Sequence, residues 1–351
     1  MHMADALLAP GVAATMYVAS AAAAVVSITK LRKDDEPSKL PTMAVTAAVV
    51  FAGQMINYTI PGTGSSGHMC GGMMLSALLG SFGGFLSMIV ILAIQCLLFA
   101  DGGLMALGAN IWNMAFYGCF VGYYLIWRPI MRSKWFGDDR SAARKRIILA
   151  SILGCVITLQ LGAFSVVLET SLSGITELPF GAFMALMQPI HLAIGLVEGL
   201  VTAAVLCFVF DSRPEMLRDV NEINGGAFEP KRSLKATVGI LAIVALVVGG
   251  GLSLFASGNP DGLEWALFGN ADGGYSTNMG LDEENFGVSS NAADTAESIQ
   301  EKTSFLPDYA FTDSDSAAGT SVSGIVGSAM VAGVALLICF VGGFFRKKKR
   351  S

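Results

Sequence analysis

The first two residues of the chain, Met1 and His2, have the types and spacing of a transition-metal chelate. The α-amine of Met1, the backbone nitrogen of His2 and the Nδ1 of its imidazole can close two fused rings around one ion. Planar nitrogen donors of this kind suit Ni(II), Cu(II) and low-spin Co(II), and they suit Zn(II), Mg(II) or Ca(II) poorly. Because the amide nitrogen must lose its proton, binding would depend on pH. The alternative interpretation is that His2 is an incidental residue of a frayed terminus.

A fourth donor for this chelate is predicted at His68, which ends a glycine-rich loop that begins at Pro61. The segment from Gly62 to Gly67 matches G-x-G-x-x-G, but it lacks the strand and βαβ context of a dinucleotide site. We therefore expect the glycines to bring the loop backbone, and His68 with it, close to another part of the chain. The sequence contains no G-x-x-x-x-G-K-[ST] motif, so no bound nucleotide is expected and ATP hydrolysis would need a partner protein.

Other polar residues are candidates for holding the metal ligands in place. His191 and Glu198 are seven residues apart, which puts them on one face of a helix expected from about residue 182. Ionisable groups inside a membrane span are functional candidates by default, although hydrogen-bonded packing elements fit the same pattern. Metal-bound imidazoles are usually oriented by such outer groups. Four further candidates, for which simple solvation is the alternative, are Gln95, Asp101, Asn110 and Asn113.

Composition indicates a polytopic membrane protein. The 351 residues are 53% hydrophobic and 14% charged, whereas a soluble domain carries about 25% charged residues. No basic stretch precedes the first apolar run, so no cleavable signal peptide is expected. The six cysteines form no C-x-x-C pair, which argues against a zinc site or a disulfide framework. Nothing in the sequence indicates nucleic-acid binding.

The basic residues predict the topology. All but one of the 22 Lys and Arg fall in four clusters, and the exception, Lys302, lies in an acidic segment from about 257 to 323. By the positive-inside rule the clusters are cytoplasmic, which places Met1 and His68 outside and the C-terminus in the cytoplasm. Nine spans satisfy this parity, and the short third span ends at a break within 81–84. The predicted spans are residues 10–30, 41–60, 69–82, 84–100, 108–128, 147–171, 182–210, 236–256 and 324–345.

The chain resembles the CbiM/NikM substrate-capture proteins of energy-coupling factor transporters. The similar stretches are Met1–Leu8, Gly67–Gly72, Leu98–Leu104, Leu107–Asn110 and His191–Gly199, while Asn259–Trp265 is similar to the auxiliary PDGLE-type module. The resemblance implies a seven-helix core and uptake of Co(II) or Ni(II) as substrate, with Met1, His2 and His68 as metal-binding residues. It also implies partners, namely a transmembrane coupling subunit and two ABC-type ATPases. Asp101 and Cys70 depart from the residues that are frequent in the family.

These observations predict an all-α polytopic protein of the cell membrane, with a core of about seven helices and two C-terminal transmembrane helices that flank an outer segment. Within that segment, Asn270 to Ser304 is expected to be loosely ordered. The predicted function is metal capture for an ATP-driven importer and not an enzymatic reaction. The alternatives are a secondary metal transporter and, less favoured, a metal-dependent membrane enzyme. The predicted domains are 1–211 (metal-binding membrane domain), 212–235 (cytoplasmic linker), 236–345 (PDGLE-type module) and 346–351 (basic tail).

Overall fold

The computed structural model describes residues 1–31, 39–220, 228–271, 279, 281, 286–311 and 318–350, with backbone alone at 39–41 and 338–350. The helices are α1 (Pro10–Leu31), α2 (Lys39–Gln54), α3 (Gly72–Phe99), α4 (Leu107–Asn110), α5 (Arg128–Arg132), α6 (Arg140–Leu172), α7 (Phe180–Ser212), α9 (Leu234–Gly250), α10 (Gly262–Phe268), α11 (Asn291–Thr303) and α12 (Ala318–Arg350). A π-type helix, η2 (Ile111–Trp127), joins α4 to α5. The remaining elements are strands β1 (Tyr58–Ile60) and β2 (Ser65–Gly67) and the short 3-10 helices η1 (Asp5–Leu7), η3 (Pro214–Met216), η4 (Leu252–Phe255) and η5 (Pro307–Tyr309).

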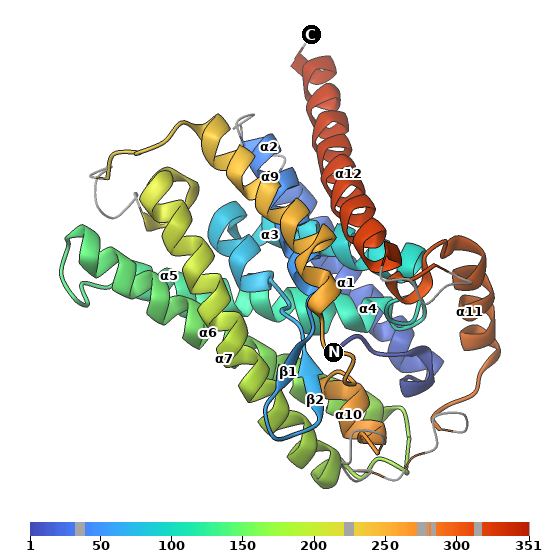
Figure 1. The fold of residues 1–351 in the computed structure, drawn as a ribbon. Coiled ribbons are helices and arrows are strands. Elements are labelled where there is room, and N and C mark those ends of the chain that lie inside the picture. Colours follow the sequence, from blue (N-terminus) through green and yellow to red (C-terminus); the bar gives the residue numbers. More distant parts are fainter. Residues whose placement is uncertain are drawn as a thin grey trace.

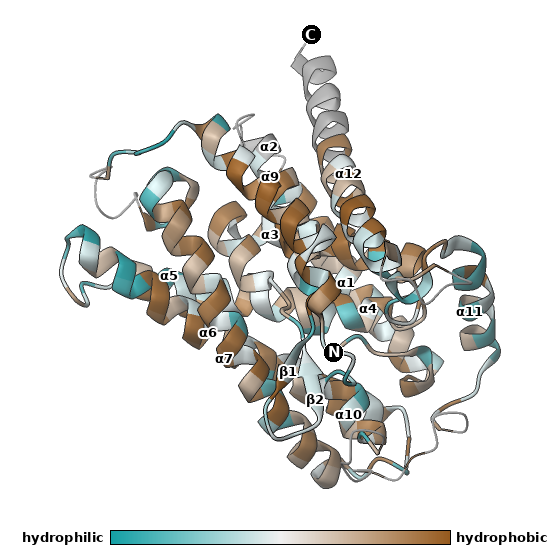
Figure 2. Cartoon of the chain, viewed as in Figure 1, coloured by the Kyte–Doolittle hydropathy of each residue, from teal (hydrophilic) through white to brown (hydrophobic). Residues whose placement is uncertain are grey.

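The predicted mainly helical, polytopic membrane class is confirmed. Six helices of the described residues are long and apolar enough to cross a membrane, and a shorter apolar helix covers Thr42–Gln54. The hydropathy colouring of Figure 2 marks mostly hydrophobic residues along α6, α7, α9 and the described part of α12, and many hydrophilic residues on α11. The count of nine spans stays a prediction. Arg32 and Lys33 of the first basic cluster, residues 221–227 of the predicted linker and the side chains of the basic tail lie outside the described residues.

Two groups of packed helices surround the buried N-terminus. Helices α6 and α7 run side by side, and η2 packs against both α3 and α6 (Figure 1). The C-terminal helices α9 and α12 pack against α2 and against each other. The C-terminal helices are therefore joined to the N-terminal part of the chain through a helix interface. Figure 1 places the N-terminus inside the molecule, close to β1, β2 and α10.

Helix α3 contains the predicted break. Gly80 has φ 78° and ψ 165°, a conformation that glycine adopts without the penalty of a Cβ atom. After Gly80 the chain folds back on itself. This is seen at Gly84, where an added Cβ would lie only 2.9 Å from the backbone nitrogen of Ser76. The break was placed within 81–84, and this position is wrong. Gly80 carries the left-handed φ, whereas Gly84 remains helical and permits close packing of the two halves.

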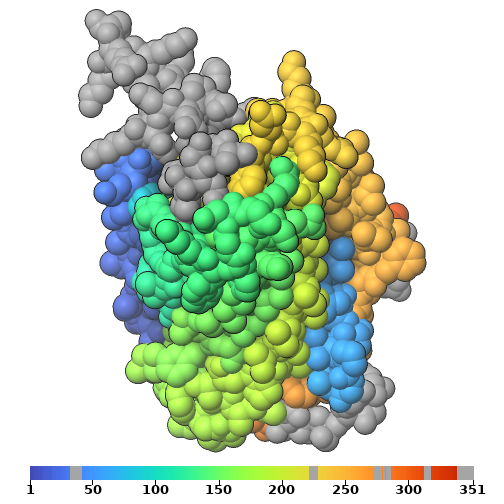
Figure 3. All heavy atoms as spheres, turned by 90° about the vertical axis from the view of Figure 1, so that its left-hand side faces the viewer, coloured from blue at the N-terminus to red at the C-terminus, as the bar shows by residue number. Residues whose placement is uncertain are grey.

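The predicted second span, 41–60, is too long. Helix α2 ends at Gln54, and β1 pairs antiparallel with β2 so that Tyr58 lies opposite Gly67. Aromatic and β-branched residues such as those of β1 favour strands, and here they pair with the glycine-rich loop. Figure 3 shows this light-blue hairpin between the yellow-green residues of α7 and the orange C-terminal module. A β-hairpin, and not an irregular loop, therefore presents His68.

The described part of the acidic segment after α10 is more ordered than its composition predicts. Residues 291–303 form α11, and the Ser290 side chain caps this helix by accepting a hydrogen bond from the N–H of Ala293. Gln300 on α11 is buried, and its Nε2 donates to the carbonyl oxygens of Cys96 (2.8 Å) and Gly102 (2.7 Å). The expectation of loose order is wrong for this part, because a capped helix with one buried amide is tied to the loop that follows α3.

Candidate metal site

The N-terminal residues are held in the interior and are not frayed. Met1 is 5% exposed and Met3 is fully buried. The Met3 N–H donates to Asn110 Oδ1 at 2.7 Å, and the Met3 carbonyl accepts hydrogen bonds from Asn110 Nδ2 (3.2 Å) and from the Gly103 N–H (2.9 Å). Gly103 is needed for this approach, because a Cβ there would collide with Asp5. The predicted polar residue Asn110 thus clamps the main chain directly after His2.

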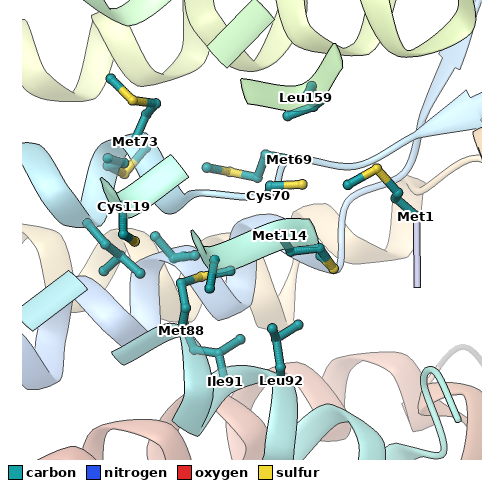
Figure 4. Packing of buried hydrophobic residues seen from close by; sticks show 14 of the residues in the cluster. Met1, Met69, Cys70, Met73, Met88, Ile91, Leu92, Met114, Cys119 and Leu159 are labelled. Carbon is teal, nitrogen blue, oxygen red and sulfur yellow. The ribbon is translucent and has the colours of Figure 1, made fainter. Parts of the chain in front are cut away.

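Apolar contacts add to this anchoring. The Met1 side chain enters a buried cluster that includes Met69, Cys70 and Leu159 (Figure 4). Its methyl group also lies close to the backbone of α6, since a Cβ on Gly162 would be 2.9 Å from Met1 Cε. Burying a methionine side chain contributes roughly 1.5–3 kcal/mol. The side chain of Met1 therefore helps to fix the position of its own α-amine.

His68 lies beside this amine. The distance from the Met1 nitrogen to His68 Nε2 is 3.4 Å. His68 Nδ1 lies 3.2 Å from the carbonyl oxygen of Met69; because a carbonyl oxygen only accepts, Nδ1 carries the proton and Nε2 keeps its lone pair. Burial, reinforced by the positive amine, lowers the pKa of His68 to about 4. The imidazole is therefore neutral at physiological pH, as metal coordination requires.

His2 completes a stack of two imidazoles. Its ring and that of His68 are 5.3 Å apart between centroids, with an interplanar angle of 20°. His2 Nε2 lies 3.3 Å from Gln95 Oε1, and His2 Nδ1 lies 3.0 Å from Asp101 Oδ1. Burial lowers the pKa of His2 in spite of the Asp101 carboxylate. A chelate would use Nδ1, so an ion would displace Asp101 from this atom, and the proton would then sit on Nε2 and be donated to Gln95 Oε1.

Gln95 is itself oriented by a neighbour. Its Nε2 donates to Gln54 Oε1 at 3.0 Å, which leaves Gln95 Oε1 to face His2. Gln54 Nε2 in turn donates to the Cys70 carbonyl at 2.8 Å. This chain of amides connects the N-terminal residues to the segment that follows His68. Gln54 is not among the site residues predicted from the sequence.

Glu198 and His191 take different positions on α7. Glu198 accepts hydrogen bonds from the backbone N–H groups of Cys70 (2.8 Å) and Gly71 (2.9 Å). His191 Nδ1 donates to the Met187 carbonyl at 2.8 Å, and its buried Nε2 has no hydrogen-bond partner among the described residues. A small cavity beside this ring is lined by Met1, Gly67, His68, Cys70, Leu159, His191, Ile194, Asp261 and Gly262. His191 thus borders the space next to the candidate ligands, whereas Glu198 secures the turn behind them.

Asn113 is farther from the donor atoms. Its Nδ2 donates to Glu169 Oε2 at 2.8 Å and contacts the Met3 sulfur at 3.6 Å. Its role is to support the packing of Met3, one residue beyond the candidate chelate. Of the six predicted supporting residues, Gln95 and Asp101 contact a candidate ligand directly, while the other four act on the adjoining backbone, border the cavity or support packing.

Asp261 was not predicted as a site residue, although the motif that contains it was noted. Its Oδ2 accepts a hydrogen bond from the Met1 amine at 2.5 Å and lies 3.9 Å from His68 Nε2. Burial lowers the pKa of the Met1 amine, but the charge and hydrogen bond of Asp261, with smaller contributions from Cys70 and Asp101, together outweigh burial, and the pKa is raised above its ordinary value. A contact between residues 1 and 261 has no signal in a single sequence.

The donor set depends on main-chain nitrogens. Within the described ranges, no three His, Cys, Asp or Glu side chains form a group able to hold a metal ion. The amine and amide nitrogens of residues 1 and 2, with two imidazoles, are the groups that can do so. An open cavity of about 830 Å³ next to His2 is lined by acidic side chains, among them Asp5, Asp101, Glu264, Glu297 and Asp308.

Comparisons with known sequences identify two matched regions. The cobalt uptake substrate-specific transmembrane region matches residues 2–216, and the PDGLE domain matches residues 235–342. A putative fused nickel transport protein, NikMN of Archaeoglobus fulgidus, is 33% identical over 339 residues, which cover 94% of this chain and 95% of the relative. The cobalt transport protein CbiM of Sorangium cellulosum is 29% identical over 62% of this chain and 94% of its own length.

Solved structures agree with these matches. The crystal structure of a truncated transition metal transporter is 30% identical, has a TM-score of 0.51, and covers 60% of this chain and 98% of that chain. A second transition metal transporter is 29% identical, with the same TM-score, and covers 60% and 92%. Because one family profile spans more than half of the residues and one relative matches along almost its whole length, the chain belongs to the family of the cobalt uptake substrate-specific transmembrane region, in the form fused to a C-terminal PDGLE domain.

Proposed function

We propose that this protein captures Ni(II) or Co(II) at the outer face of the cell membrane and delivers it as the substrate-binding component of an importer. The observation that carries the proposal is the 3.4 Å separation between the Met1 amine and His68 Nε2, two groups 67 residues apart. The metal ligands are the Met1 amine, the amide nitrogen and Nδ1 of His2, and His68 Nε2. Such a set of four nitrogens suits both ions.

Loading exchanges protons for the metal. The Met1 amine must lose the proton that it shares with Asp261, and the His2 amide must lose its own. His68 needs no deprotonation, because its Nε2 already carries a lone pair directed away from the Met69 carbonyl. The buried, hydrogen-bonded frame around Met3 and Cys70 limits the movement that binding requires, and this pre-organisation favours affinity.

ATP-driven transport requires partners. The sequence has no P-loop, so we propose that a transmembrane coupling subunit and ABC-type ATPases supply the energy, and that the N-terminus faces outside. Names of relatives such as the nickel and cobalt transport proteins support a transporter over a membrane enzyme. A secondary transporter remains the second candidate. Co-purification of the chain with ATPase subunits from its native membrane supports the first, and uptake by the chain alone in sealed vesicles supports the second.

The metal site is tested by equilibrium binding of Ni(II) and of Co(II) to the purified full chain with an unmodified N-terminus. His2→Ala and His68→Ala are each expected to abolish high-affinity binding, because each removes a direct ligand. Glu177→Ala, at an exposed position before α7, is the matched control and should bind normally. Unchanged affinity in the double His2→Ala, His68→Ala variant would sink the proposal. Competition between the two ions in the same assay assigns the substrate.

A further inference from the structure

In the P-D-G-L-E segment, Pro260 to Glu264, the carboxylate of Asp261 makes two sets of contacts, one to the start of α10 and one to the Met1 amine. Oδ1 of Asp261 caps α10, accepting hydrogen bonds from the N–H groups of Leu263 (2.7 Å) and Glu264 (3.0 Å). Glu264 Oε2 accepts from the Asp261 N–H at 3.1 Å, which completes a capping box. Oδ2 faces the other way and bonds the Met1 amine at 2.5 Å. The cap therefore fixes the carboxylate in the orientation that reaches the N-terminus.

The turn that contains Asp261 contacts two elements of the candidate metal site, strand β2 on one side and helix α7 on the other. The Pro260 carbonyl accepts a hydrogen bond from the Ser66 N–H at 2.8 Å, two residues before His68. A Cβ on Gly262 would lie 3.1 Å from His191 Cε1 and 3.1 Å from Ile194 Cδ1. Leu263, the next residue, is buried. Backbone pairing on one side and glycine contact on the other hold Asp261 at the cavity.

The negative charge of the Asp261 carboxylate matters for metal binding, because the bound ion brings a positive charge into a buried site. A divalent ion bound by one deprotonated amide and three neutral nitrogens carries a net charge of +1 in a buried site. An uncompensated buried charge is costly. Two carboxylates lie close enough to compensate this charge: Asp261, whose Oδ2 is 3.9 Å from His68 Nε2, and Asp101, whose Oδ1 is 3.0 Å from His2 Nδ1. Of the two, only Asp261 also bonds the Met1 amine.

We propose that Asp261 is a positioning residue for the metal site, supplied by the C-terminal module. It holds the Met1 amine beside His68 before the ion arrives and compensates the charge of the bound ion afterwards. This inference rests on the proposed function, since it concerns the same site. It also assigns the PDGLE module a direct part in substrate binding, beyond packing against α2.

The test removes the negative charge of Asp261 and keeps the helix cap that its side chain forms on α10. Asn is as good an N-cap as Asp, so Asp261→Asn removes the negative charge with little change of shape. Loss of a group that supports a metal ligand costs about 10–100-fold in affinity, and we expect a loss of this size for Ni(II), with faster dissociation and a shifted ligand-field absorption band. The matched control is Glu177→Gln, which removes one carboxylate charge at an exposed position outside the site, and which should bind Ni(II) like the wild type.

The outcomes separate this inference from the proposed function. If the wild type binds neither Ni(II) nor Co(II), or binds them without His2 and His68, the proposed function fails first. If the wild type binds and Asp261→Asn binds with the same affinity, rate and spectrum, the positioning role is overturned. Equal losses in Asp261→Asn and Glu177→Gln assign the effect to a general loss of negative charge and also overturn it. If Asp261→Asn does not fold, Asp261→Ser, another uncharged N-cap, carries the same measurement with the same two outcomes.

Discussion

The carboxylate of Glu198 on α7 accepts a hydrogen bond from the backbone N–H of Cys70 at 2.8 Å. With a second bond from the Gly71 N–H, it fixes the turn that directly follows His68. Gly71 has φ 81°, a conformation that suits glycine and that lets both N–H groups point to one carboxylate. The turn behind the candidate ligand His68 is thus fixed by a residue of α7 that lies 128 positions from Cys70.

Glu198→Gln is expected to weaken this support. The amide of glutamine can accept only one of the two hydrogen bonds, and leaving a buried donor unsatisfied costs about 1–3 kcal/mol. We expect a lower unfolding temperature and a loss of Ni(II) affinity of about 10–100-fold. The control is Glu177→Gln, at an exposed position. A variant with lower stability and unchanged affinity would show that the turn is structural alone.

Gln95→Leu is expected to reduce affinity through His2. The change removes the acceptor 3.3 Å from His2 Nε2, so the ring loses the bond that orients its Nδ1 toward the ion, at a cost of about tenfold or more in affinity. Titration with Ni(II) measures the effect. Gln160→Leu is the comparison, because Gln160 bonds to the Gln188 carbonyl, a contact on other helices. Equal affinity in the two variants argues against a role of Gln95.

Asn110→Ala is expected to loosen the N-terminus. It removes both hydrogen bonds to Met3, so the first three residues gain freedom that binding must then remove. Amide hydrogen exchange at Met3 should become faster, and Ni(II) affinity should fall. The comparison is Asn113→Ala, which removes a contact to the Met3 sulfur and a hydrogen bond to Glu169 but no bond to the Met3 main chain. It should leave the exchange at Met3 slower than in Asn110→Ala.

An added residue before Met1 is expected to abolish high-affinity binding. The extension converts the α-amine into an amide and moves the new amine away from His68, so the chelate loses a donor. The same residue added after Ser351 is the control and should have no effect. Metal content of the two purified proteins, measured by mass spectrometry, decides the matter; equal metal loading would rule out the amine as a ligand.

Metal affinity is expected to increase with pH. The pKa of the Met1 amine is raised above its ordinary value, chiefly by Asp261 against the effect of burial, so the amine is protonated at neutral pH and the ion must displace that proton. The His2 amide releases a second one. His68, with a pKa of about 4, releases none above pH 5. The logarithm of the association constant should therefore rise between pH 6 and pH 8, with a slope of about one to two per pH unit. A flat profile would contradict the chelate.

Local patterns in the sequence account for part of this structure. Met1 and His2 are adjacent, so their three nitrogens need no fold to form a chelate, and apolar runs show their length directly. The glycine-rich loop also pointed to His68. The helix break was predicted within a few residues, but its position at Gly80 depended on which of several glycines took the left-handed conformation.

The sequence by itself therefore determined the membrane class and the candidate ligands, because both depend on residues close together in the chain. Only the tertiary structure decided what holds them. Gln54 reaches Gln95 across two helices, Glu198 reaches Cys70 from α7, and Asp261 reaches the Met1 amine across 260 positions. Hydrogen bonds act over about 3 Å, so such pairs exist only where the packed helices and the hairpin bring the groups together.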